Sequence, residues 1–247
     1  MKVTLIDYTG AGAPDPASYA AGLLIFTKNT RLEMDLTSVE KYQNAPKDSQ
    51  ETELAYMANT IPSSWEFVDY TFMIQDVTRA FTHQLVRTRT ASFAQQTMRV
   101  LNVNGWGYGA GPSIKDDMLR NQMYNDTMES IAKSYDDLID EGAAIEDARG
   151  VLPTNIHTNI VMKANLRTMA EMVTKRSSPR TQGEYRDFIE AVKVEMIRVH
   201  PWVRLFLERD FNRAAKDLDE MIQKLPDNIA SEYKTNMIKL VDQMRKG

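Results

Sequence analysis

Cysteine is absent from this chain of 247 residues. Without a thiol the protein can form no disulfide, no cysteine-ligated zinc site and no iron–sulfur cluster, and it has no cysteine nucleophile. Histidine is scarce as well, because His83, His157 and His200 are the only three and form no ligand pair at a recognisable spacing. We therefore expect no metal site.

Long hydrophobic runs are also missing, and no stretch approaches the length of a membrane span. The start of the chain, residues 1–7, lacks a secretory pattern. The net charge of −4 argues against a nucleic acid backbone as the main partner. With 43% hydrophobic residues, the chain can bury a sizeable core in one domain, so we expect a cytoplasmic enzyme with neither nucleic acid nor membrane as partner.

The most informative segment is 81–99, which gathers three arginines with several amides and hydroxyls. A guanidinium group offers a planar fork of donors that suits phosphate, and neighbouring amides can contact the polar edge of a ring. The segment therefore indicates a nucleotide site. The alternative is a solvated face with surface ion pairs.

The local pattern places this cluster at a junction between a strand and a helix. Residues 66–75 alternate as a half-buried strand does, with one apolar face formed by Val68, Tyr70, Phe72 and Ile74. Asp76 is the expected N-cap of the next helix. The apolar contacts expected from that helix are Val77, Phe81, Leu85 and Val86.

A second block of interest runs from Arg149 to Val203. Its middle is predicted to be a helix that begins after Pro153 or Asn155 and ends at residues 177–179, because proline disfavours helix in the residue before it. Asn165, Met169, Met172 and Arg176 would then form one stripe of about 16 Å, which suits one elongated ligand or two adjacent ones. The alternative is an exposed amide at Asn165 and an ordinary C-terminal cation at Arg176.

Elsewhere the pattern predicts a strand over 2–8, a helix over 17–27, helix in the second half of 37–59 and a long helix over 121–148 with Met123, Ile131, Leu138 and Ile145 toward the core. The glycine-rich segment 105–112 is expected to be a loop, either a plain connector or a cover for the substrate. We expect one domain over 1–211 and a C-terminal helical extension over 212–247, packed on that domain or on a partner subunit. Its role stays open.

The run Arg87-Thr88-Arg89, followed by seven residues and Thr97, resembles the signature of the flavin-dependent thymidylate synthases, which is Arg-His-Arg, seven residues and Ser. The approach over 81–86, the exit over 97–99 and the block from 149 to 203 are also similar to that family. The resemblance follows the order of elements over residues 1–211. The absence of cysteine agrees with it, because cysteine-dependent thymidylate synthases begin with a thiolate that adds to the pyrimidine ring.

The resemblance implies an α/β (α+β) fold with a central mixed sheet and long helices, assembled as a homotetramer. It implies transfer of a one-carbon unit from methylenetetrahydrofolate to C5 of dUMP, which gives dTMP, with FAD as cofactor and NADPH as reductant. The residues implied to line the FAD are Ser64, Arg87, Thr88, Arg89, Gln95, Asn165, Arg167 and Glu171. Those implied to line the nucleotide are Gln84, Arg87, Gln95, Gln96, Thr97, Arg99, Arg149 and the catalytic Arg176, which would stabilise negative charge on the pyrimidine.

Four positions depart from the family pattern. Thr88 replaces a histidine, Ala94 an amide, Gln95 a carboxylate and Glu171 a common asparagine. The expected substrate is dUMP, because a donor-only arginine suits a uracil carbonyl. The departures leave two alternatives open. One is methylation or hydroxymethylation of another pyrimidine nucleotide such as dCMP, and the other is a non-catalytic nucleotide-binding homologue.

Overall fold

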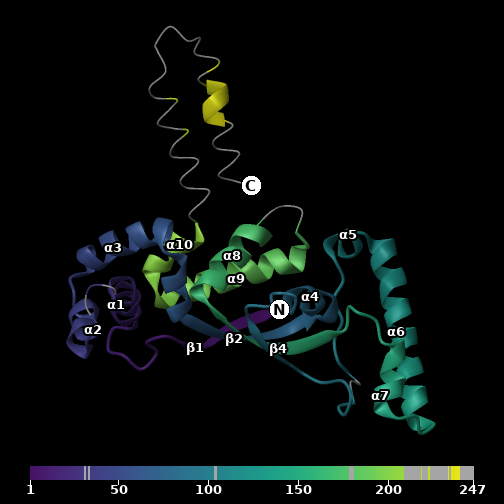
Figure 1. The fold of residues 1–247 in the computed structure, drawn as a ribbon. Helices are drawn as coiled ribbons and strands as arrows, with labels where there is room; N and C mark the ends of the chain where they lie inside the picture. The colour runs from purple at the N-terminus through teal and green to yellow at the C-terminus, as the bar shows by residue number, and fades with distance from the viewer. Residues whose placement is uncertain are drawn as a thin grey trace. The chain divides into compact units, whose positions relative to one another are not determined.

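The structure is a computed structural model that describes residues 1–30, 32, 34–102, 105–177, 181–208, 218, 222, 233 and 235–239. Its described elements are strands, α-helices and short 3-10 helices. Figure 1 shows how the strands and helices follow one another. A four-stranded sheet and many helices confirm the predicted α/β class.

Contacts between residues divide the chain into two compact units. Unit 1 comprises Met1–Ile6 and Thr71–Lys163, and unit 2 comprises Asp7–Tyr70 and Ala164–Gly247. The predicted boundary at residue 211 lies outside the described residues and stays a prediction.

The sheet has the strand order β1-β2-β4-β3. β1 spans Lys2–Tyr8, as predicted, and β2 spans Asp69–Thr78. β3 (Ser92–Gln95) pairs antiparallel with β4 (His157–Asn165). In β2 the apolar side chains alternate as predicted, because Tyr70, Phe72 and Ile74 are all fully buried.

The start of helix α4 (Arg79–Leu85) differs from the prediction. Asp76 is not its N-cap, because β2 continues through this residue. Thr78 caps α4 instead, and its Oγ1 accepts a hydrogen bond of 3.1 Å from the backbone N–H of Phe81. Asp76 adopts a φ of 54°. Of the four predicted apolar contacts, Val77 lies in the strand and Val86 is exposed.

The single helix predicted from residue 153 or 155 is wrong, because β4 occupies residues 157–165. Thr158, Ile160, Met162 and Ala164 are buried in alternation along β4, which is the two-residue period of a strand. Helix α8 follows over Leu166–Arg176 and ends where the sequence predicted.

Unit 2 contains the helices α1 (Pro16–Asn29), α2 (Leu36–Gln43), α3 (Lys47–Thr60), α9 (Gly183–Val199) and α10 (Arg204–Leu207), with the 3-10 helices η1 (Pro62–Phe67) and η3 (Pro201–Val203). The helix expected over 17–27 is α1, and the segment 37–59 holds two helices instead of one. A β-carbon added at Gly22 would lie 2.4 Å from the Gln43 backbone. The glycine thus permits the close packing of α1 on α2.

His200 lies in an aromatic cage in unit 2. Its ring is fully buried and stacks on Trp202 with a centroid distance of 5.2 Å. His200 Nε2 lies 3.1 Å from the carbonyl oxygen of Thr9, and Nδ1 lies 2.8 Å from the Tyr70 hydroxyl. Since a carbonyl only accepts, Nε2 carries the proton and Nδ1 accepts from Tyr70. His200 therefore links Thr9, which follows β1, to Tyr70 of β2 and to the start of η3.

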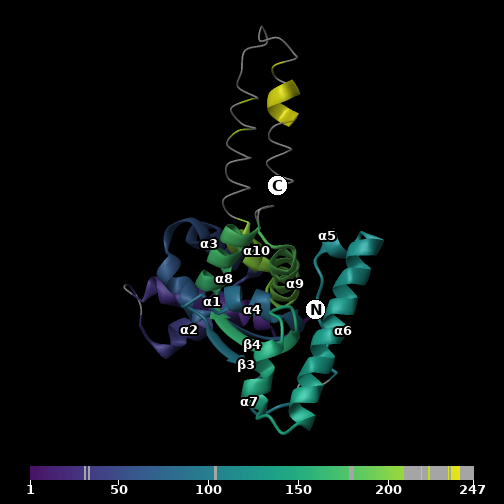
Figure 2. The same cartoon turned by 90° about the vertical axis from the view of Figure 1, so that its right-hand side faces the viewer.

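Unit 1 carries helices α5 (Pro112–Lys115), α6 (Met118–Asp140) and α7 (Ile145–Ala148) and the 3-10 helix η2 (Arg149–Val151). The long helix predicted over 121–148 is broken at Gly142, whose φ of 88° no helix contains. Figure 2 shows α7 beside α6. The predicted inward face is partly wrong, because Met123 and Leu138 are exposed whereas Met128 and Tyr135 are buried.

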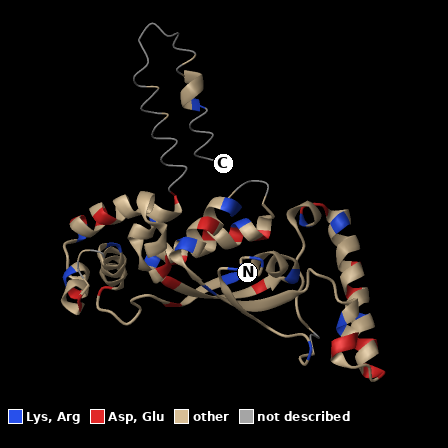
Figure 3. Ribbon diagram, in the orientation of Figure 1, with Lys and Arg blue, Asp and Glu red and all other residues tan. Residues whose placement is uncertain are grey.

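Acidic residues gather at the C-terminal end of α6, as Figure 3 shows. Asp137, Asp140 and Glu141 are exposed there, in line with a solvated face. The part of the chain that the structure describes contains no helix that is both long and apolar enough to cross a membrane.

Little of the C-terminal extension falls within the described residues. Ile222 is buried and packs against Leu218 and Met237, so two parts of the predicted extension are in contact. Tyr233 is exposed.

Candidate functional site

The predicted site residues fall into both units. Unit 1 holds Gln84, Arg87, Thr88, Arg89, Gln95, Gln96, Thr97, Arg99 and Arg149. Unit 2 holds Ser64, Asn165, Arg167, Glu171 and Arg176. Every residue predicted to contact the nucleotide lies in unit 1 except Arg176.

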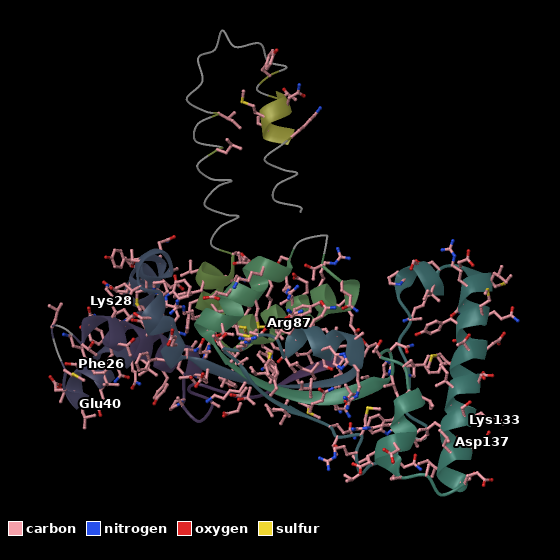
Figure 4. The ribbon with its side chains drawn as sticks, turned by 45° about the vertical axis from the view of Figure 1, so that its right-hand side comes forward. Phe26, Lys28, Glu40, Arg87, Lys133 and Asp137 are labelled. Atoms are coloured by element: carbon pink, nitrogen blue, oxygen red, sulfur yellow. The ribbon has the colours of Figure 1, made fainter. Side chains whose placement is uncertain are left out.

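Arg87, Thr88 and Arg89 lie in the turns that follow α4. The turn is closed by backbone hydrogen bonds, from Arg87 N–H to the Gln84 carbonyl (3.3 Å) and from Thr88 N–H to the Leu85 carbonyl (3.0 Å). Arg87, labelled in Figure 4, and Arg89 are exposed, and neither forms an ion pair with any described residue. Their donors are therefore available to an anionic ligand.

Gln95 is held by two buried hydroxyl groups. Its Nε2 donates to Thr82 Oγ1 over 2.9 Å and lies 3.5 Å from Thr158 Oγ1. Thr82 is fully buried and Thr158 is 2% exposed. The nitrogen of the amide that replaces the usual carboxylate is thus bonded within unit 1, at the edge of the sheet.

Gln96 joins β3 to β4 through both its backbone and its side chain. Its N–H donates to the Asn159 carbonyl (2.9 Å), and its Oε1 accepts from Asn159 Nδ2 (3.0 Å). Thr97 follows, and its Oγ1 accepts a hydrogen bond of 3.1 Å from the N–H of Arg99. These contacts fix the backbone that carries three of the predicted nucleotide residues.

Arg99 and Arg149 meet at Glu146. Arg99 Nε lies 3.6 Å from a Glu146 carboxylate oxygen, and Arg149 Nε donates to the Glu146 carbonyl over 3.1 Å. The Arg99 and Glu146 side chains are both more than half exposed, so this ion pair is weak. An anion can therefore compete with Glu146 for Arg99.

Arg79 belongs to the same region, although no sequence pattern predicted a role for it. Its Nη2 donates to the Gln96 carbonyl over 3.0 Å. Its Nε is buried and has no hydrogen-bond partner among the described residues. Burial, and secondly the nearby charge of Arg149, lower the pKa of Arg79 below its ordinary value. Arg79 stands out because it lies near residues 96 and 149. These residues are distant in the sequence, so a local pattern could not identify Arg79.

We use the term arginine cluster for Arg79, Arg99 and Arg149. Glu146 is the one carboxylate that pairs with any of the three within the described part of the chain. The cluster therefore carries an excess of positive charge, which suits the dianionic phosphate of a nucleotide.

In unit 2, Asn165 is the N-cap of α8 and does not lie within a helix, so the predicted four-residue stripe is wrong at its first member. Its Oδ1 accepts a hydrogen bond of 2.9 Å from the N–H of Thr168. The cap leaves the Asn165 amide nitrogen as a donor for a ligand.

Arg167 belongs to a network of ion pairs. It contacts Glu66 (2.7 Å) and Glu171 (3.5 Å), and Glu171 also contacts Lys175 (3.3 Å). The hydrogen bond to Glu66 raises the pKa of Arg167. Both carboxylate oxygens of Glu171 therefore face cations, which balance the negative charge at this position.

Arg176 ends α8, and its guanidinium carbon lies 4.8 Å from the centre of the Tyr185 ring. This cation–π contact orients the arginine without neutralising it. Ser64 lies in η1 and is only 4% exposed. The assignment of Ser64 to a ligand stays a prediction.

The glycine-rich loop is tied to unit 1 at several points. Tyr108 forms a bridge with Ile156, and the Gly109 carbonyl accepts from Tyr124 Oη (2.5 Å) and Asn155 Nδ2 (3.2 Å). These contacts favour a plain connecting loop over a loop that covers the substrate.

Comparison with known proteins places these residues in a family context. Residues 4–202 match the family described as "Thymidylate synthase complementing protein". The chain is similar to proteins named "Flavin-dependent thymidylate synthase". It is 35% identical over 147 residues to that of Geobacter sulfurreducens, covering 59% of this chain and 62% of the relative. It is 30% identical over 222 residues to that of Clostridium tetani, covering 81% and 84%. The relative from Pyrococcus abyssi is 29% identical over 216 residues, covering 83% and 85%. The match thus spans less than two thirds of the Geobacter protein.

Proposed function

The chain belongs to the thymidylate synthase complementing protein family, and from this premise we propose that it acts as a flavin-dependent thymidylate synthase. The proposed reaction transfers a one-carbon unit from methylenetetrahydrofolate to C5 of dUMP and yields dTMP, with NADPH as reductant. The observation that carries the proposal is the arginine cluster beside Gln96 and Thr97 in unit 1, because its excess positive charge fits a nucleotide phosphate.

In this proposal Arg99 and Arg149 bind the phosphate of dUMP. Gln84, Gln95, Gln96 and Thr97 contribute hydroxyl and amide groups that contact the sugar and the base. Arg176 stabilises the negative charge that develops on the pyrimidine ring, since a guanidinium group donates to a carbonyl oxygen and cannot lose its proton.

Two exposed arginines support FAD as the flavin in this proposal. The exposed guanidinium groups of Arg87 and Arg89 have no carboxylate partner among the described residues, and they suit the diphosphate. Thr88, Gln95, Asn165, Arg167, Glu171 and Ser64 complete the proposed set. When bound, FAD supplies the reducing equivalents, and the protein orients it and polarises its surroundings. Arg167 would share its donors with Glu66 and Glu171.

The ion pairs of Glu171 favour dUMP over dCMP. A free carboxylate could accept a hydrogen bond from the exocyclic amine of cytosine. Here Glu171 already faces Arg167 and Lys175, so less of its capacity remains for such a contact. We therefore retain dCMP as the second candidate and dUMP as the substrate.

Turnover tests the proposal directly. The purified protein is mixed with FAD, NADPH and methylenetetrahydrofolate, and then with dUMP or dCMP separately, and the product is identified by mass. We expect dTMP from dUMP, and flavin absorbance either as isolated or after FAD titration. If dCMP is modified and dUMP is not, dCMP is the substrate. Product from neither nucleotide would favour a non-catalytic homologue.

Assembly is a separate part of the proposal. The family resemblance implies sites completed by several subunits, so the mass in solution should correspond to four chains. A persistent monomer that still forms dTMP would contradict shared sites. The cytoplasmic location stays a prediction that fractionation of the source cells would test.

A further inference from the structure

The side-chain amide of Gln95 is held with its nitrogen toward two buried hydroxyl groups. Nε2 donates to Thr82 Oγ1 over 2.9 Å and lies 3.5 Å from Thr158 Oγ1. All three residues belong to unit 1. The amide oxygen, Oε1, has no hydrogen-bond partner among the described residues. It is open to a ligand, since the one buried side-chain atom without a partner in the described part of the chain is Arg79 Nε.

The Thr82 hydroxyl decides which end of the Gln95 amide faces it. Thr82 Oγ1 donates to the Arg79 carbonyl over 3.1 Å, and a hydroxyl has only one proton. Toward Gln95 the Thr82 oxygen can therefore only accept, so it requires the amide nitrogen. With the amide reversed, Thr82 would have to give up its bond to the Arg79 carbonyl, and one hydrogen bond fewer would form.

We propose that Thr82 is a positioning residue of the nucleotide site, which makes Gln95 present a hydrogen-bond acceptor to the ligand. The inference rests on the proposed function, in which Gln95 contacts the sugar and the base of dUMP. An outward Oε1 accepts and cannot donate, so it selects a donor group of the nucleotide. Outside the phosphate, the donors of dUMP are the sugar 3′-hydroxyl and the ring N3–H.

The orientation is important because residue 95 is a glutamine. A carboxylate has an acceptor at either end, so its contact with a ligand does not depend on which oxygen faces Thr82. A glutamine has a donor at one end and an acceptor at the other, and its neighbours distinguish the two. Thr82 should therefore affect ligand binding more strongly when residue 95 is glutamine than when it is glutamate.

A double-mutant cycle tests this dependence. Binding of dUMP is measured by calorimetry in the presence of FAD for the wild type, Thr82→Val, Gln95→Glu and the double variant, at about pH 8, where a carboxylate is ionised. Valine has the shape of threonine without the hydroxyl. Thr82→Val should weaken dUMP binding about 3- to 10-fold in the glutamine background, the effect of one lost hydrogen bond, and less than about 2-fold in the glutamate background.

Two analogues of dUMP identify the donor that Gln95 contacts. One lacks the 3′-hydroxyl, and the other carries a methyl group on N3 in place of the hydrogen. Thr82→Val should leave the affinity for the analogue without the contacted donor unchanged, because Oε1 has nothing to accept from. The same variant should still weaken binding of the other analogue.

Two further variants separate the hydroxyl group from the fold. Thr82→Ser keeps the hydroxyl and should bind dUMP within about 2-fold of the wild type. Thr127→Val is the matched control, because Thr127 is exposed on α6 of the same unit and its hydroxyl also donates to a carbonyl of its own helix, that of Met123. Its dUMP affinity should equal that of the wild type.

A purely structural role for Thr82 would give a different result. If Thr82 only supports the fold or Arg79, Thr82→Val would weaken dUMP equally in both backgrounds, and that outcome overturns the proposal. An unchanged dUMP affinity in Thr82→Val would do the same. Failure of the proposed function alone is distinguishable, because the wild type would then bind dUMP and form no dTMP, while the dependence on residue 95 would persist. A wild type that binds neither dUMP nor the analogues would refute both.

Discussion

Acid should destabilise the protein by protonating His200, and a substitution of His200 should remove this part of the pH dependence. The buried ring donates from Nε2 to the Thr9 carbonyl and accepts at Nδ1 from the Tyr70 hydroxyl. Protonation of Nδ1 would prevent it from accepting from Tyr70 and would place a cation in a buried site. Burial therefore lowers the pKa of His200 from 6.5 to about 4.

The sign of the effect on stability follows from proton binding. Between pH 6.5 and about 4, the unfolded chain binds a proton at His200 that the folded chain does not bind. The free energy of unfolding therefore falls as the pH falls through this window, and the contribution is fully present above it. At 1.36 kcal/mol per pH unit, the full effect is about 3 kcal/mol.

Urea unfolding from pH 7.5 to pH 4 measures this effect. Other groups also titrate, so the quantity of interest is the difference between the wild type and His200→Gln, whose amide can donate to Thr9 and accept from Tyr70 without titrating. At pH 7.5 the variant should be less stable by about 1–3 kcal/mol, because its packing and hydrogen bonds are imperfect. Towards pH 4 the wild type should lose about 3 kcal/mol more than the variant, so the gap should close or reverse. The exposed His83 supplies the control His83→Gln, and equal pH dependence in wild type and His200→Gln would refute the reasoning.

Three further changes address the site and the fold. Arg176→Ala should reduce dTMP formation by about one to two decades without loss of flavin, because it removes a charge-assisted hydrogen bond to the base; steady-state rates and the flavin spectrum measure this. Gly22→Ala should lower the free energy of unfolding by about 1–3 kcal/mol or more, because the added carbon would lie 2.4 Å from the Gln43 backbone. Asn165→Ala should lose the cap of α8, worth about 0.5–2 kcal/mol, and also weaken FAD binding, as urea unfolding and flavin titration would report.

Each of these changes has a matched control. Lys175→Ala removes a neighbouring cation that pairs with Glu171, and equal losses of rate in Lys175→Ala and Arg176→Ala would argue against a specific role for Arg176. Gly12→Ala adds the same carbon where no atom lies within 4 Å, so its stability should match the wild type. Asn165→Ser keeps a capping oxygen and removes the amide. Undiminished FAD affinity in Asn165→Ser would show that Asn165 only caps the helix.

Features that depend on neighbouring residues could be predicted from the sequence. The alternation of Tyr70, Phe72 and Ile74 identified one face of β2, and the proline-containing stop identified the end of α8 at Arg176. The motif from Arg87 to Thr97 identified the family, because its spacing requires no knowledge of the fold.

Features that depend on residues far apart in the chain could not be predicted and became apparent in the fold. The sequence predicted a helix through 157–165, because the signals for the start and the end of a helix lie on either side of this segment. Pairing with β3 makes it a strand instead. Asn165 consequently became a cap. Arg79 has no local mark of function, and it is distinguished only because the fold brings it to the Gln96 carbonyl and near Arg149. Charge and burial act through space, so a linear pattern could not contain them.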